Sequence, residues 1–71
     1  MATQVVAHIT GTVWKIEVKV GAAVAEGDVL VILESMKMEM PIEAPDAGRV
    51  VEIRVKEAQP VAEGAVVVIL E

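Results

Sequence analysis

The sequence predicts an all-β domain, a flattened sandwich of two small antiparallel sheets with pseudo-twofold symmetry. The first observation is composition: 15 valines, 6 isoleucines and 3 threonines stand against only 3 leucines, and β-branched side chains pack well on a pleated surface. The second is an internal repeat, and the third is a period-two alternation of apolar and polar residues. A chain of 71 residues is long enough for one domain, 1–71.

The repeat has an offset of 37 residues. Residues 11–34 and 48–71 are identical at 14 of 24 aligned positions, including the segments Val-Ala-Glu-Gly and Val-Ile-Leu-Glu. Repeats this short rarely bury a face alone, so the two copies, residues 1–34 and 38–71, are expected to pack on each other. Two copies favour a sandwich or flattened barrel over a solenoid.

Each copy begins with a predicted strand. Residues 3–9 form this strand in the first copy, and residues 38–44 are the counterpart in the second. Pro41 has no backbone N–H to donate to a neighbouring strand. The strand that contains Pro41 is therefore expected at the edge of a sheet.

An alternating strand follows in each copy, and it is expected to be half-buried. Its apolar face carries Trp14, Ile16, Val18 and Val20 in the first copy and Val51, Ile53 and Val55 in the second. Trp14, the only large aromatic residue, is interpreted as a packing residue. After a Gly- and Ala-rich connection, the last strand of each copy is continuously apolar and should be covered more completely. These last strands are Val29–Leu33 and Val66–Leu70.

The segment between the copies is the candidate functional site. Strands usually have about five or six residues, so the apolar stretch 29–42 must reverse, and the repeat places the reversal near residues 35–38. Tight hairpins favour residues that accept a positive φ, yet Met36 and Lys37 stand there instead of Gly or Asn, at a conformational cost. Such conflicts between local preference and fold are common at functional sites. The turn is expected at the end of the molecule opposite both termini.

Composition and charge exclude several classes of function. The net charge of −5 argues against a phosphate-binding surface, and a nearly aromatic-free chain lacks stacking platforms for nucleic acid. There is no cysteine for a disulfide or a zinc site. The longest apolar run, Ala65–Leu70, is far below the ~20 residues that span a bilayer, so no membrane partner and a cytoplasmic location are expected. His8 has no partner nearby in sequence, and neither a metal site nor a catalytic residue is predicted.

The residues Glu34-Ser35-Met36-Lys37-Met38-Glu39 resemble the attachment motif of biotinyl domains, the biotin carboxyl carrier proteins of the biotin/lipoyl attachment family. The family usually has alanine or serine before Met-Lys-Met. The segment Ala44-Pro45…Gly48 is also similar, and the resemblance covers essentially the whole chain. The chain departs from the pattern at His8, Ala58 and Ala65, where the repeat would place Pro45, Gly21 and Asp28. No insertion corresponds to the protruding "thumb" of some bacterial carriers.

The resemblance implies a barrel-sandwich hybrid fold with biotin attached covalently to Lys37 by a biotin protein ligase. Met36 and Met38, together with Glu34, Ser35 and Glu39, would be recognition contacts. The domain itself would be a non-catalytic carrier. It would shuttle a carboxyl group between biotin carboxylase and carboxyltransferase subunits or domains of a carboxylase whose acceptor is an acyl-CoA, such as acetyl-CoA, or a 2-oxo acid.

Two alternatives remain open. The first is a lipoyl carrier domain of an oxo-acid dehydrogenase-type complex. Lipoyl domains typically have Asp and Ala beside the attachment lysine, so methionine on both sides of Lys37 favours biotin. The second is an unmodified β-hairpin interaction module. The intact mass of the protein distinguishes the three hypotheses, since they predict a biotin adduct, a lipoyl adduct and an unchanged mass, respectively.

Overall fold

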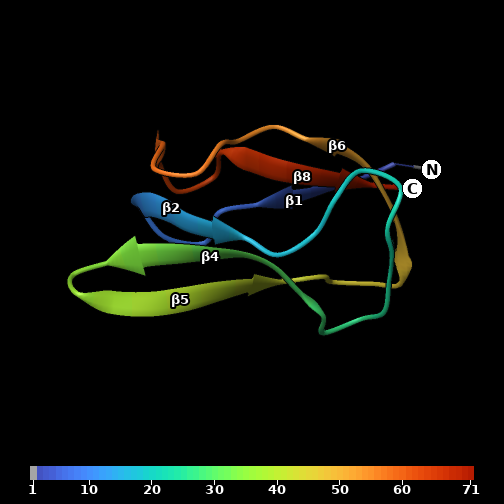
Figure 1. Cartoon of the computed structure of the whole chain (residues 1–71), viewed down its shortest axis with the longest axis horizontal. Coiled ribbons are helices and arrows are strands. Elements are labelled where there is room, and N and C mark those ends of the chain that lie inside the picture. The colour runs from blue at the N-terminus through green and yellow to red at the C-terminus, as the bar shows by residue number, and fades with distance from the viewer. Residues whose placement is uncertain (1) are drawn as a thin grey trace.

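The computed structural model describes residues 2–71 as two four-stranded antiparallel sheets (Figure 1). The strand orders are β1-β8-β6-β3 and β5-β4-β2-β7. The described residues contain no helix, and so none long and apolar enough to cross a membrane. The prediction of an all-β sandwich is confirmed. The strands are β1 (Thr3–Val6), β2 (Gly11–Ile16), β3 (Ala23–Val24), β4 (Val29–Ser35), β5 (Met38–Glu43), β6 (Gly48–Ile53), β7 (Pro60–Val61) and β8 (Val66–Leu70).

The two sheets are related by the sequence repeat. Adding 37 to the residue numbers of β2 and β3 gives β6 and β7, and by the same offset β4 corresponds to β8 and β1 to β5. The first half contributes β1 and β3 to one sheet and β2 and β4 to the other, and the second half does the reverse. The halves are therefore interlocked, because each sheet needs strands from both. Loop hydrogen bonds repeat in the same way: Ala7 N–H donates to the Ala65 carbonyl, and Ala44 N–H to the Asp28 carbonyl, both at 2.8 Å.

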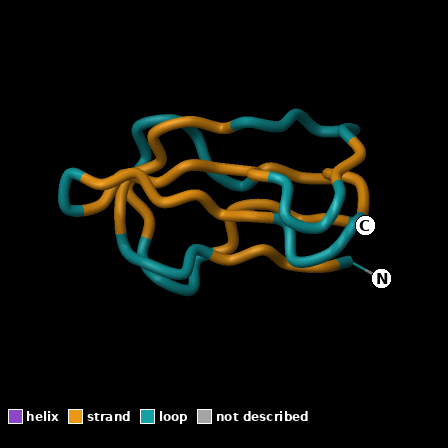
Figure 2. The backbone as a smooth tube through the Cα atoms, turned by 90° about the horizontal axis from the view of Figure 1, so that it is seen from below, coloured by secondary structure: helices purple, strands orange, loops and turns teal. Residues whose placement is uncertain are grey.

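The core is built from aliphatic side chains that occur in repeat-related pairs. Leu33 and Leu70 form one such pair and Val13 and Val50 another, and all four are at most 2% exposed. No polar or charged side chain is buried among residues 2–71. The molecule is elongated, with principal extents of 32 × 17 × 17 Å. The sheets thus enclose a thin aliphatic core, and a hairpin turn projects at one end of the long axis while both termini lie at the other (Figure 2).

The interpretation of Trp14 as a packing residue is wrong, because a β-bulge interrupts the predicted alternation. Val13 pairs with Leu33 and Lys15 with Ile32, which leaves Trp14 as an extra residue on β2. Trp14 consequently faces outward and is 49% exposed, while Val13 is buried. The same bulge recurs in β6, where Val51 is exposed. A bulge of this kind shifts every side chain before it to the other face.

Several strands are also shorter than the sequence suggests. The first strand ends at Val6 instead of residue 9, and the alternating strand ends at Ile16 instead of residue 20. Val20 is 63% exposed and lies in the connection that follows. The predicted position of Pro41 is confirmed, since β5 is the edge strand of its sheet.

The turns after β2 and β6 differ in one residue that affects stability. Gly21 has φ = +96° and its repeat counterpart Ala58 has φ = +71°. A Cβ on Gly21 would meet no atom within 4 Å, so only backbone strain opposes alanine there. A left-handed conformation costs an L-residue roughly 1–2 kcal/mol. Ala58 therefore carries strain that Gly21 does not.

We expect Ala58→Gly to raise the free energy of unfolding by about 0.5–1 kcal/mol. Relief of the left-handed strain outweighs the entropy that glycine adds to the unfolded chain. Gly21→Ala is the mirror variant and should lower the same quantity by about 1 kcal/mol. Urea unfolding followed by circular dichroism measures both. Equal stabilities for all three proteins would contradict the assignment of strain to Ala58.

Candidate lysine modification site

The junction between the two halves is a tight hairpin with a two-residue turn. β4 and β5 pair from Val29↔Glu43 to Ser35↔Met38. Met36 and Lys37 form the turn with φ = +53° and +65°. Positive φ at both central residues is the geometry that matches the right-handed twist of a hairpin. The predicted reversal is confirmed. Met36 and Lys37 also adopt the positive φ angles that were expected to be costly for these residue types.

The base of the hairpin is fixed on its other side by β2. β4 lies between β5 and β2, and Glu34 is paired with both Glu39 and Thr12. Gly11 permits a close approach there, because a Cβ at this position would lie 2.6 Å from the Glu34 carbonyl oxygen. β2 therefore supports β4 as far as Glu34, and β5 pairs with β4 as far as Ser35. The two turn residues extend beyond these pairings.

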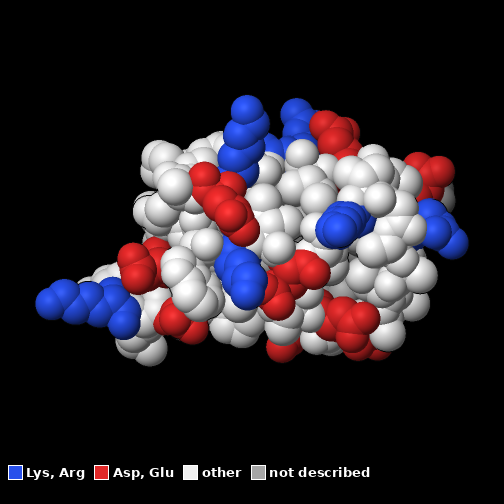
Figure 3. Space-filling model, in the orientation of Figure 1, with Lys and Arg blue, Asp and Glu red and all other residues white. Residues whose placement is uncertain are grey.

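The hairpin projects from the end of the molecule opposite the chain termini (Figures 1 and 2). At the terminal end, β1 and β8 pair through Thr3↔Leu70. Lys37 is exposed, and in Figure 3 a basic side chain extends outward from the hairpin end. All four lysines of the chain are exposed. Position in the turn, and not exposure, is thus what distinguishes Lys37 from the others.

Methionine side chains surround the turn. Met36 is 92% exposed and Met38 is 61% exposed, which is unusual for apolar residues. They line an apolar groove of about 210 Å³ whose other members are Ile9, Ser35 and Met40. The remaining predicted recognition residues, Glu34 and Glu39, are exposed and face each other across the hairpin pair. The structure therefore brings all the predicted site residues together at one end.

Ile9 belongs to this groove but was not predicted from the sequence. Its repeat counterpart at the opposite end is Asp46. One copy has an apolar residue where the other has a carboxylate. This difference indicates that the two ends of the molecule differ in function. His8 lies elsewhere, in a groove with Pro45 between β1 and β5. Among residues 2–71, no three His, Asp or Glu side chains are grouped to hold a metal ion.

A primary amine on an exposed turn can form an amide with an activated carboxylic acid. No side chain of residues 2–71 pairs with the Lys37 ammonium group, and no wall encloses it, so an attached acyl group would extend into water. This fits biotin, which joins a lysine through its carboxyl group. The fold and the hairpin together give the geometry of an attachment domain, a sandwich with one lysine side chain exposed in the turn of a projecting hairpin.

Comparison with known proteins establishes the family. The family model described as "Biotin-requiring enzyme" matches residues 1–70, and the chain belongs to this biotin/lipoyl attachment family. A relative named biotinylated protein TB7.3 homolog, from Mycobacterium leprae, is 50% identical over 48 residues, which cover 68% of each chain. The biotin/lipoyl attachment protein of Bacillus subtilis is 46% identical over 41 residues, covering 58% of this chain and 56% of the relative. The predicted family and biotin as its cofactor are confirmed.

A solved structure extends the comparison to a large carboxylase. The urea carboxylase of Kluyveromyces lactis superposes with a TM-score of 0.95 at 34% identity. The match covers all of this chain and 6% of the carboxylase chain. The chain therefore corresponds to a biotin carrier domain of biotin-dependent carboxylases, and it spans a small part of that enzyme.

Proposed function

We propose that Lys37 is the biotin attachment residue and that the domain is the carboxyl carrier of a biotin-dependent carboxylase. The observation that carries the proposal is the position of Lys37 in a two-residue turn with positive φ, between two exposed methionines. The family match supports biotin as the attached group. The similarity to the urea carboxylase domain supports a carboxylase as the surrounding enzyme.

The structure suits a carrier because its stiff and mobile parts are separate. The turn is held by strands on both sides of β4, so movement at the attachment point is left to the lysine stem and the attached arm. When bound, biotin supplies a ring nitrogen that accepts and releases a carboxyl group. Tethering of that arm raises its effective concentration at each partner site.

The proposed partners are a biotin protein ligase, which forms the amide, and biotin carboxylase and carboxyltransferase sites, which load and unload the arm. The domain itself performs no bond-making step in this scheme. Met36 and Met38 offer polarizable, adaptable side chains to each of these surfaces in turn. A cytoplasmic location remains a prediction from composition.

Intact mass measurement after co-expression tests the proposal. The protein is produced with a biotin protein ligase in one culture and with a lipoate ligase in another. We expect one biotin adduct in the first and unmodified protein in the second. A lipoyl adduct without a biotin adduct, or an unchanged mass in both cultures, would refute the biotin carrier assignment.

The methionines are expected to select biotin over lipoate. Met36→Asp combined with Met38→Ala replaces their apolar surfaces by the residue types that flank the lysine in lipoyl domains. We expect biotinylation to fall at least about tenfold, a difference of ~1.4 kcal/mol, with gain of a lipoyl adduct, measured by mass spectrometry of both co-expressions. The control is Val20→Asp with Val51→Ala, the same type of change at exposed positions far from the turn. Unaltered biotin labelling of the Met36 and Met38 variant would show that these side chains do not select.

A further inference from the structure

A recess separate from the groove lined by Met36 and Met38 lies at the hairpin end of the molecule. It has a volume of about 390 Å³ and is lined by Thr12, Val13, Trp14, Glu34, Glu57 and Ala58. Glu34 is three residues from Lys37 in the sequence, and the connection after β6 that holds Glu57 and Ala58 turns at the same end (Figure 1). Trp14 is the one aromatic residue of this lining, and it is 49% exposed.

The backbone of this recess is duplicated at the opposite end by the repeat. Ala58 N–H donates to the Val13 carbonyl at 2.7 Å, and Gly21 N–H donates to the Val50 carbonyl at the same distance. The reverse bonds also correspond: Val13 N–H donates to the Gln59 carbonyl at 2.8 Å and Val50 N–H to the Ala22 carbonyl at 2.9 Å. The two ends thus share one backbone arrangement, and they differ in the side chains that it carries.

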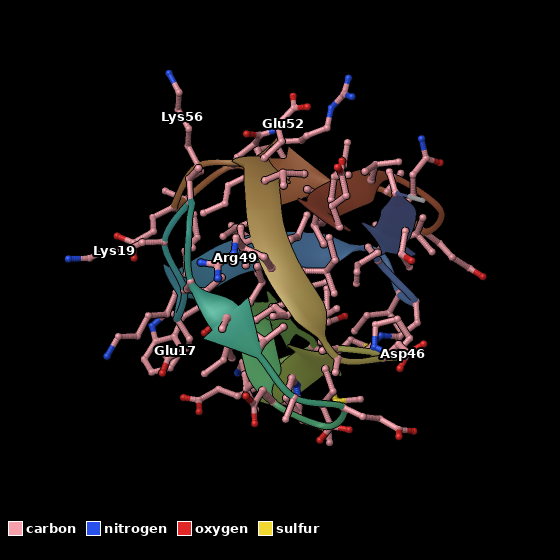
Figure 4. All side chains as sticks on the ribbon, turned by 90° about the vertical axis from the view of Figure 1, so that its right-hand side faces the viewer. Glu17, Lys19, Asp46, Arg49, Glu52 and Lys56 are labelled. Carbon is pink, nitrogen blue, oxygen red and sulfur yellow. The ribbon has the colours of Figure 1, made fainter. Side chains whose placement is uncertain are left out.

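At the opposite end, an arginine of the chain itself occupies the position equivalent to the recess. The Arg49 guanidinium donates a hydrogen bond of 2.6 Å to the carbonyl oxygen of Gly21. Figure 4 shows Arg49 extending from β6 across this end of the molecule. The counterpart of Arg49 in the recess is Thr12, whose short side chain cannot reach the equivalent carbonyl. Among the hydrogen bonds within residues 2–71, none is donated to the Ala58 carbonyl oxygen.

The other side-chain differences make the recess more attractive to a cation. Glu57 stands where the opposite end has Val20, and Trp14 stands where it has Val51. Glu57 is oriented by the Ile16 N–H, which donates to its carboxylate at 3.3 Å. The ion pairs formed within residues 2–71 are Lys15–Glu17 and Arg54–Glu52, so the carboxylates of Glu34 and Glu57 are available.

We propose that this recess receives an arginine side chain from a partner protein that docks on the hairpin end. The guanidinium would donate to the Ala58 carbonyl and to the carboxylates of Glu57 or Glu34, and would stack on the Trp14 indole. Arginine fits better than lysine because its planar fork both stacks and donates in several directions. The net charge of −5 attracts a basic partner surface. The identity of that partner as a carboxylase or ligase surface rests on the proposed function, since it must approach Lys37.

Titration of the unmodified domain with N-acetyl-arginine amide tests the recess directly. Trp14 is the only aromatic residue, so its fluorescence and its indole N–H resonance report on the site without interference. We expect saturable changes, with a roughly millimolar dissociation constant for so small a probe, together with shifts of the Thr12 and Ala58 amides. N-acetyl-lysine amide should bind about fivefold more weakly, since it lacks the stacking fork.

Two variants copy the opposite end of the molecule and should therefore fold. Trp14→Val removes the stacking surface, and Thr12→Arg supplies an internal arginine that fills the recess as Arg49 does. Each substitution should weaken the binding of N-acetyl-arginine amide at least about fivefold. The chemical shift of the Ala58 amide measures this binding in both variants. Thr3→Arg adds the same charge at the terminal end and should leave binding unchanged.

Chemical-shift changes that stay linear without saturation would overturn the proposed arginine site, and so would equal binding by the parent protein and its Thr12→Arg variant. The titration is performed in the Lys37→Arg background, which carries no biotin. A negative titration would therefore not bear on the proposal that Lys37 carries biotin. Absence of biotinylation would likewise not bear on the arginine site.

Discussion

Replacing Lys37 with arginine is expected to abolish biotinylation completely. The turn geometry and the exposed methionines remain in this variant, and so does the positive charge. The guanidinium stays protonated at accessible pH and does not act as the amine nucleophile that an amide requires. Co-expression with biotin protein ligase should give a single unmodified species by intact mass, where the parent protein gives the adduct.

Two control variants define what the ligase recognises. Lys56→Arg removes a lysine that is also exposed but lies on the connection after β6, and it should be biotinylated like the parent. Met36→Lys with Lys37→Met keeps the composition of the turn and moves the amine to the other turn position, so its side chain leaves in a different direction. This variant should carry no biotin. Retention of the adduct in Lys37→Arg would show that another amine is the target.

Truncation of the core beneath the hairpin is expected to have the largest effect on stability. Leu33 is fully buried, pairs with Val13 on β2 and with Met40 on β5, and so joins the hairpin to the sandwich. Leu33→Ala should lower the free energy of unfolding by about 3 kcal/mol, from the lost transfer energy and the cavity left behind. A domain of this size has only about 4–10 kcal/mol in total. Urea unfolding gives the difference.

The repeat provides a matched control for this core variant. Leu70 occupies the equivalent position in β8 and is 2% exposed, so Leu70→Ala should cost the same within about 1 kcal/mol. Val20→Ala removes an exposed side chain and should change stability by less than about 0.5 kcal/mol. A loss below 1 kcal/mol for Leu33→Ala, on the scale of about 3 kcal/mol expected for a buried leucine, would mean that the core is not packed as described.

The strands and the hairpin could be predicted because they follow from local patterns and the repeat. Val-rich segments and the offset of 37 located most strands, and Pro41 placed β5 at an edge. Trp14 could not be placed, because a bulge adds one residue without leaving a mark in the alternation of side chains. The exchange of strands between the sheets was also not predictable, since pairing partners are chosen by the tertiary fold.

The turn that forms the candidate site was predictable because it breaks a local rule. Lys37 and its methionines occupy turn positions that favour glycine or asparagine, and the resemblance to biotinyl domains rests on these same residues. Ile9 and the recess beside Trp14 were missed because their positions depend on how β2 and the β6 connection meet at the hairpin end. The differences between repeat partners, Ile9 with Asp46 and Thr12 with Arg49, are the sequence signal that would have revealed them.

The most direct test of the central claim is to locate the adduct by tandem mass spectrometry of the wild-type protein after co-expression with biotin protein ligase. All four lysines are exposed, and only Lys37 lies in the hairpin turn with positive φ. We expect biotin on Lys37 alone, with Lys15, Lys19 and Lys56 unmodified. Biotin on any of these three lysines, or a protein without biotin, would contradict the claim that the hairpin makes Lys37 the carrier residue.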